Sequence, residues 1–163
     1  MRTTSRKSLA AIGAGITLGL AAATAAFATA PSGENVTPLA RGQLAAPTNF
    51  NRQVTGGHVR IKTVGSLDAL MMQITLQPGG TGGWHMHAGP HITIIKQGTL
   101  TIIDAKCKRH DVPMGHAIVD SGTTTGKDEN LGDTPVVFNI TFLIPHSAAS
   151  PRIDQPAPAG CNA

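Results

Sequence analysis

The sequence lacks the motifs that mark the commonest catalytic classes. It holds no Gly-x-Ser-x-Gly elbow, no phosphate-binding loop, no dinucleotide fingerprint and no carboxylate pair placed for glycoside cleavage. No stretch carries the apolar period of a convincing amphipathic helix. Any chemistry must therefore come from other side chains, in a chain made mainly of strands.

The chain also lacks a marked excess of charge once its first residues are set aside. It has 13 lysines and arginines against nine acidic residues, but Arg2, Arg6 and Lys7 lie in a leader segment, which leaves 10 against nine. Nucleic-acid binding needs basic side chains clustered on one surface. Only the short run 106–109 is basic, as solvated turns often are, so we expect no nucleic-acid partner.

Residues 1–28 have the form of a secretory signal peptide. Basic residues precede an uncharged apolar run, and Ala26-Phe27-Ala28 fits a signal peptidase site. We expect cleavage after Ala28, because a cut after Ala30 would leave Pro31 beside the cleaved bond. The alternative is an uncleaved anchor, but the run is barely long enough to cross a bilayer and no basic stop follows it. We therefore expect a secreted or extracytoplasmic protein with no stable membrane anchor.

The rest of the chain has the length of one domain. Residues 29–49 are rich in Ala and Pro and predict a flexible N-terminal arm, residues 50–146 predict a barrel, and residues 147–163 predict an extended C-terminal tail. Regular short strands with turn residues between them indicate an all-β sandwich, barrel or jelly roll. The candidate strands are 58–64, 70–76, 92–96, 100–104, 117–120 and 136–144.

Two cysteines, Cys107 and Cys161, are present in this chain. In an oxidising compartment they predict a disulfide that pins the tail to the barrel. Two free thiols are the alternative. A metal role is less favoured because the two cysteines lack the close spacing of zinc ligands.

The segment from 79 to 91 carries the strongest indication of chemistry. His85 and His87 are two residues apart, so on a strand both imidazoles point to the same face. Gly89-Pro90 can bend the chain so that His91 returns as a third ligand. Three imidazoles with an open position are typical of a catalytic metal site, and the candidate metals are divalent Zn, Fe, Mn, Ni or Cu.

This segment resembles the first motif of the cupin superfamily, Gly-x5-His-x-His-x3-4-Glu-x6-Gly. Gly79, His85, His87 and Gly98 stand at the motif positions, and His91 replaces the glutamate. The resemblance covers roughly residues 59–161 and extends to small exported bacterial cupins. It implies a double-stranded β-helix, the cupin jelly roll, with any metal near the barrel centre. Cupins often dimerise through sheet edges, so a homodimer is one of its implications.

The second cupin motif is incomplete. Residues 115–122 match its strand and Asn130 matches its closing asparagine, but the expected histidine position falls near Thr125 or Gly126. Neither of these side chains binds a metal as histidine would. The chain therefore departs from the usual four ligands at two positions.

Several interpretations of the site stay open at this point. His91 can act as a neutral third ligand, or it can face outward and leave a weak site of two ligands. His116 is a candidate replacement ligand or a pocket residue. Trp84 is a candidate for lining the pocket, with core packing as the alternative.

The function that this pattern favours is an exported cupin that binds a divalent transition metal, a small molecule, or both. One alternative is a metal-dependent oxygenase or isomerase acting on a small organic substrate. Another is a metal-free binding or structural cupin. The fold alone does not choose between an enzyme and a binding protein.

Overall fold

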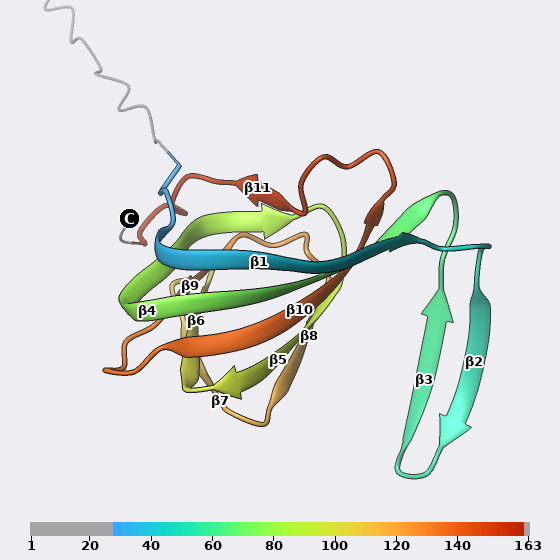
Figure 1. The fold of residues 1–163 in the computed structure, drawn as a ribbon, viewed down its shortest axis with the longest axis horizontal. Helices are drawn as coiled ribbons and strands as arrows, with labels where there is room; N and C mark the ends of the chain where they lie inside the picture. The colour runs from blue at the N-terminus through green and yellow to red at the C-terminus, as the bar shows by residue number, and fades with distance from the viewer. Residues whose placement is uncertain (1–27, 162–163) are drawn as a thin grey trace, which may run out of the picture.

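The computed structural model describes residues 28–161, in which strands and loops make up the whole fold (Figure 1). No helix in this range is long and apolar enough to span a membrane. The predicted signal peptide lies almost wholly outside the described residues and stays a prediction. The strands are β1 (Ser32–Gln43), β2 (Asn49–Val54), β3 (Gly57–Lys62), β4 (Leu67–His87), β5 (His91–Gln97), β6 (Thr99–Asp104), β7 (Arg109–Pro113), β8 (Ala117–Asp120), β9 (Gly126–Glu129), β10 (Val136–Pro145) and β11 (Arg152–Asp154).

Nine of these strands form one antiparallel sheet that curls into a nearly closed barrel (Figure 1). The strand order is β7-β6-β9-β4-β10-β5-β8, and β1 and β11 also pair with β4. The predicted all-β jelly-roll class is thus confirmed.

Strand β4 holds the barrel together because it takes different partners along its length. Its first half pairs with β1 on one edge and β10 on the other, and its second half pairs with β9 and β11. Register shifts occur where the two halves meet, opposite β1 and opposite β9. Such bulges bend a strand and increase its twist, which lets β4 serve both parts of the barrel.

The core follows the alternation of β10. Its inward side chains are all apolar and buried, as a strand with one face toward a core requires. They join two clusters, one with Leu76, Ile95 and Leu100 and the other with Leu70. Burial of each such side chain stabilises the fold by about 1.5–3 kcal/mol. The inward residues are Val136, Phe138, Ile140, Phe142 and Ile144.

The predicted flexible arm at 29–49 is mostly strand. Ser32–Gln43 forms β1 and pairs along β4 down to the pair Gln43 and Asp68. No apolar alternation marks this strand in the sequence, because the side chains of β1 are nearly all exposed. Backbone hydrogen bonds to an open edge of β4 place it there.

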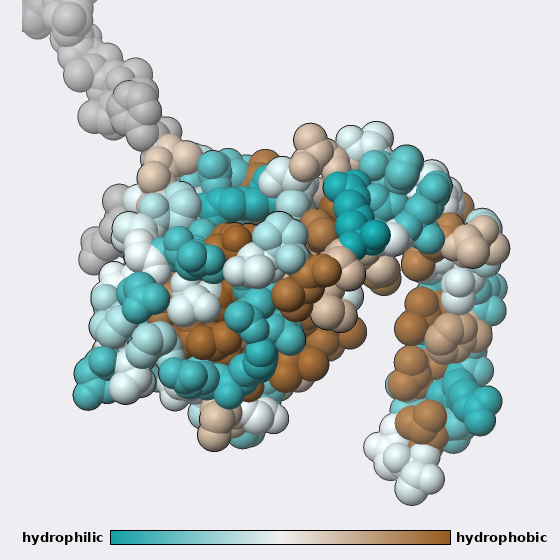
Figure 2. All heavy atoms as spheres, in the orientation of Figure 1, coloured by the Kyte–Doolittle hydropathy of each residue, from teal (hydrophilic) through white to brown (hydrophobic). Residues whose placement is uncertain are grey.

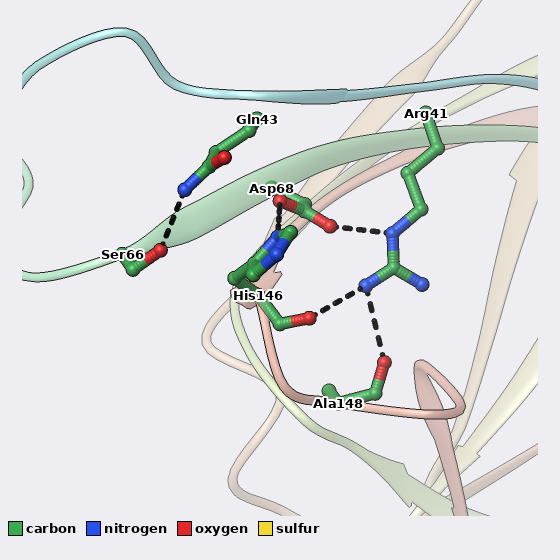
Figure 3. Close-up of polar contacts among 6 residues, drawn as sticks. All are labelled: Arg41, Gln43, Ser66, Asp68, His146 and Ala148. Atoms are coloured by element: carbon green, nitrogen blue, oxygen red, sulfur yellow. Dashed lines mark hydrogen bonds and ion pairs between the residues drawn. The ribbon is translucent and has the colours of Figure 1, made fainter.

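A polar cluster fastens the end of β1 to the barrel (Figure 3). Arg41 donates from Nε to the buried Asp68 and from Nη2 to the carbonyls of His146 and Ala148, both at 3.1 Å. His146 Nδ1 lies 2.8 Å from the other oxygen of Asp68. The hydrogen bond from His146, followed by that from Arg41, lowers the pKa of Asp68.

Residues 50–62 were predicted to belong to the barrel, and the structure places them outside it. Strands β2 and β3 pair with each other in a separate two-stranded sheet, here called the ribbon (Asn49–Lys62), which projects beside the barrel (Figure 1). The apolar alternation of a strand shows which face is apolar, but it does not show which other surface buries that face.

The predicted extended tail contributes to the barrel as well. Strand β11 pairs with β4 residue by residue, so that Arg152 lies opposite His87 and Asp154 opposite His85. The predicted Cys107–Cys161 disulfide is present, with the two Cα atoms 5.4 Å apart. It joins the chain beyond β11 to the turn between β6 and β7.

Candidate functional site

The barrel encloses a cavity of about 600 Å³. Its walls are mainly apolar side chains from β4, β6 and β10, among them Ile74, Leu100, Phe138 and Ile140. Imidazoles and carboxylates interrupt this apolar lining. A cavity of this size and character is typical of a site for a small organic molecule.

Three imidazoles meet in this cavity. His85 and His87 come from the end of β4 and His91 from the start of β5. The ring centroids of His85 and His87 are 4.7 Å apart, and those of His87 and His91 are 4.4 Å apart. His91 therefore faces inward, and the alternative of an outward-facing His91 does not hold.

The chain returns to this point because Gly89 can approach β10 closely. A Cβ atom on Gly89 would lie 2.0 Å from the carbonyl oxygen of Leu143, so no side chain fits there. Phe142 on β10 packs beneath the histidines, with its ring centroid 5.0 Å from that of His87 and 5.3 Å from that of His91. The Gly-Pro bend expected from the sequence thus brings the start of β5 against the Phe142 ring.

Burial lowers the pKa of two of these imidazoles, those of His87 and His91. It is the main cause that lowers the pKa of His87 to about 3, and the neighbouring His85 and His91 lower it further. Burial also lowers the pKa of His91. His85 Nδ1 lies 2.8 Å from the carbonyl oxygen of Gly83, to which an Nδ1–H donates, so Nε2 is the ring nitrogen left to face a ligand. A neutral imidazole is the form that binds metals.

Carboxylates surround the histidines, and sequence reasoning missed their role. Asp128 on β9 places Oδ1 3.8 Å from His85 Nε2, and Asp120 on β8 lies opposite His91 in the sheet. Glu34 on β1 also lines the cavity, and burial followed by the charge of Asp128 raises its pKa. No local spacing could reveal these residues, because long-range strand pairing brings them to the site.

The two cations of the cavity wall each pair with an acid that lies outside the lining. Lys127 Nζ is 3.0 Å from Glu129 and 5.3 Å from the centre of the Trp84 ring. Arg152 Nε donates to Asp154, while its buried Nη2 has no hydrogen-bond partner. The carboxylates of Glu34, Asp120 and Asp128 favour a cation at this end of the cavity, whereas the charge of Arg152 opposes one and lowers the pKa of His87.

The donor chemistry of the site fits a divalent transition metal. Nδ1 of His87 and Nδ1 of His91 are buried without a hydrogen-bond partner, which is costly unless something else occupies them. Between residues 28 and 161, however, no group of three or more His, Cys, Asp or Glu side chains is positioned to hold a metal ion. Binding would thus require the imidazole rings to turn about their side-chain torsions.

The two predicted pocket residues lie elsewhere. His116 is exposed and is not among the residues that line the cavity. Trp84 is fully buried but outside the lining, in agreement with its alternative role in core packing. His116 lies outside the cavity lining because it stands in the turn before β8, where its backbone carbonyl accepts a hydrogen bond from the N–H of Ile95.

The solved structures that resemble this fold include proteins described as cupins. They include a cupin domain from Bordetella pertussis Tohama I, with 19% identity and a TM-score of 0.42 over 46% of this chain and 80% of that chain. A Cupin_2 domain of an XRE family transcriptional regulator from Enterobacter cloacae shows 15% identity and a TM-score of 0.45 over 69% of this chain and 97% of that one.

An oxalate oxidase in complex with the substrate analogue glycolate shows 21% identity and a TM-score of 0.42, over 52% of this chain and 45% of that chain. No family model and no curated protein matches the sequence. Because the overall scores are modest, the jelly-roll assignment rests on the strand pairing itself.

Proposed function

We propose that the barrel binds a small, largely apolar organic molecule together with a divalent transition metal held by His85, His87 and His91. The observation that carries this proposal is the cavity of about 600 Å³, whose apolar walls converge on three inward imidazoles. The surrounding carboxylates support a cation, and Asp128 is the candidate for a further ligand beside His85. A bound divalent cation would polarise an oxygen atom of the organic molecule.

The protein's own groups define what each part of the site contributes. The apolar walls exclude water and favour a hydrocarbon or aromatic body. The histidines offer imidazole nitrogens at one end, where the Phe142 ring packs against His87 and His91. These features suit a ligand with a single polar group at one end.

Metal analysis tests this function directly. Chelator-stripped mature protein is exposed in turn to Mn, Fe, Ni, Cu and Zn, and the bound metal is counted after desalting. We expect about one equivalent in the unsubstituted protein and in His116→Ala, and less than about a tenth in His87→Ala. Loss of binding in His116→Ala as well, with all variants folded, would contradict the assigned ligands.

A metal-free binding protein is the second candidate, and the lack of a ready three-residue metal site in the described residues favours it. In that case no metal is retained, but small phenols and organic acids still raise the melting temperature by linkage. Oxygen uptake measured with the same compounds and a loaded metal separates an oxygenase from a binding protein.

We also infer that the protein is exported. The predicted signal peptide and the Cys107–Cys161 disulfide both support this, because disulfides persist mainly in oxidising compartments. Fractionation of producing cells, with N-terminal sequencing of the mature protein, provides the test. An uncleaved chain in the cytoplasm would refute export.

A further inference from the structure

A fourth histidine of the cavity wall is paired with an acid and is not used by the proposed metal site. Asp104 ends β6 and His110 lies near the start of β7, and both side chains line the cavity. Nε2 of His110 lies 3.1 Å from Oδ2 of Asp104. Both side chains are partly exposed, so the pair is accessible to a ligand and to water.

The turn after β6 holds the carboxylate of this pair in place. Oδ1 of Asp104 accepts hydrogen bonds from the backbone N–H groups of Lys106, at 2.9 Å, and Lys108, at 3.0 Å. The disulfide of Cys107 ties the same turn to the C-terminal tail. The hydrogen bond from His110 is the main cause that lowers the pKa of Asp104 to about 2, so this carboxylate is ionised near neutral pH. Because an ionised carboxylate only accepts hydrogen bonds, the neutral ring of His110 carries its proton on Nε2 and keeps Nδ1 as an acceptor.

The strand register places the pair on the inner face of the barrel, across from His85. Residues directly opposite each other on antiparallel strands share a face. His110 lies opposite Ile102, which lines the cavity. Asp104 lies opposite Gly126, and Gly126 lies opposite His85. Two strand spacings separate the backbones of Asp104 and His85 by about 10 Å, which leaves room for a group of the ligand between the two side chains.

Gly126 keeps the space between the two sides open. It stands in the part of the chain where the second cupin motif carries a histidine, but it has no side chain of its own. An added Cβ there would meet the carbonyl oxygen of Ile103 at 3.5 Å, an ordinary contact, so no side chain of residues 28–161 fills this place. A group bound here would have the three imidazoles on one side and the pair of His110 and Asp104 on the other.

The carboxylates around the pair favour a ligand that arrives uncharged. Asp104 on β6 and Asp128 on β9 both line the cavity, whereas the cation of Lys127 is paired with Glu129. Negative charges at this end of the cavity repel a ligand that is already an anion. A neutral ligand that gives a proton to His110 inside the cavity leaves the net charge of the site unchanged. In such a pair the carboxylate orients the ring and lies close to the charge that the ring gains.

We propose that His110, positioned by Asp104, takes a proton from a hydroxyl group of the ligand, and that the cavity therefore binds a small apolar molecule with an acidic hydroxyl, such as a phenol. This inference rests on the proposed function, because it names the class of molecule that the cavity binds. The O–H bond of the ligand breaks, its proton passes to Nδ1 of His110, and the electron pair stays on the oxygen. The ligand becomes an oxyanion between His110 and the three imidazoles, and the ring becomes an imidazolium paired with Asp104.

Two nitro compounds of similar size test this assignment. 4-Nitrophenol has a hydroxyl group and becomes yellow when it loses the proton, whereas 4-nitroanisole has a methyl ether in its place and no proton to lose. The mature protein is desalted after exposure to zinc, which is colourless. Binding of each compound is measured from the rise in melting temperature, and ionisation is measured from absorbance at one fixed pH near neutrality. We expect both compounds to bind, and bound 4-nitrophenol to be more ionised than the free compound.

Substitution of each member of the pair gives the specific readout. We expect His110→Gln to lower the ratio of bound phenolate to bound phenol about tenfold, which corresponds to one pKa unit of the bound probe. Asp104→Asn keeps an acceptor for the backbone of the turn but no longer fixes the ring, so we expect the ratio to fall in the same direction. The matched control is His116→Gln, an exposed histidine outside the cavity lining, which leaves the ratio unchanged. Circular dichroism and melting temperature establish that each variant is folded.

Failure of the pair and failure of the cavity give different results. If 4-nitroanisole binds but the phenolate ratio is the same in His110→Gln as in the unsubstituted protein, the role of His110 is wrong and the cavity stands. Loss of the bound zinc in His110→Gln would make His110 a metal ligand, which also overturns its role as a base. If neither compound binds to the unsubstituted protein, the proposed function fails together with this inference.

Discussion

The barrel and the ribbon are built from the same kinds of residues, yet only one of them makes a core. Both alternate apolar and polar side chains along antiparallel strands. In the barrel, β4 and β10 have neighbours on both edges and their inner side chains pack against other strands across the interior. In the ribbon the same alternation produces an apolar face whose side chains stay exposed (Figure 2). Strand patterning therefore sets which face is apolar, and topology decides whether that face is buried.

The largest expected difference between the two regions comes from removing one phenyl ring from each. Phe142 is 2% exposed, whereas Phe50 is 45% exposed. We expect Phe142→Ala to lower the free energy of unfolding by about 3–5 kcal/mol. For Phe50→Ala we expect a change within about 0.5 kcal/mol. Urea unfolding followed by tryptophan fluorescence measures both, and equal losses would contradict the comparison.

The disulfide adds a constraint to the barrel that the ribbon lacks. The two bonded cysteines are 54 residues apart in the sequence, so the bond closes a long loop. We expect the double variant Cys107→Ser/Cys161→Ser to lose about 2–4 kcal/mol of unfolding free energy. The same urea experiment, run with and without a reductant, checks this. If the reductant lowers the stability of the double variant as much as that of the unsubstituted protein, the disulfide is not the cause.

The Asp68 cluster makes the attachment of β1 depend on pH. Since the pKa of Asp68 is lowered in the folded state, its contribution to stability is present above the unfolded value of about 3.9 and is lost as the pH falls through the folded pKa. We expect Asp68→Asn to lower the melting temperature at pH 7, with a difference that shrinks as the pH falls below about 4. The matched control is Asp133→Asn, an exposed carboxylate, which should shift the melting temperature little. A difference that grows toward low pH would contradict the assignment.

A smaller effect on stability, but a specific one on the site, is expected from Gly82→Ala. The new Cβ would lie 2.4 Å from Oδ1 of Asp128, so the carboxylate must move and its position beside His85 changes. We expect a stability loss below about 1 kcal/mol, because only the end of one side chain shifts, together with weaker metal retention. Gly42→Ala is the control, since nothing lies within 4 Å of its added Cβ. Unchanged metal retention in Gly82→Ala would remove Asp128 from the proposed site.

Local patterns in the sequence predicted only the features that neighbouring residues determine. The strands around 92–96, 100–104, 117–120 and 136–144 were identified because their apolar residues alternate or cluster, and three histidines were identified by their spacing. Five strands were missed because they are exposed or short, namely β1, β2, β7, β9 and β11. Glu34 and Asp128 come from two of these strands, so the acidic half of the site could not be found without the long-range pairing.

The smallest expected effect is that of removing the ribbon altogether. Gln43 and Asp68 pair at the end of β1 and β4, and Leu44 donates its backbone hydrogen bond to Leu67, so a short Gly/Ser linker in place of residues 48–63 can join the two strands without disturbing either. Loop-closure entropy changes little with such a replacement. We expect the unfolding free energy to stay within about 0.5 kcal/mol of the full chain, because no barrel side chain depends on the ribbon for burial. A larger loss in urea unfolding would mean that the ribbon supports the barrel of its own chain, and the contrast between a self-sufficient barrel and an exposed ribbon would fail.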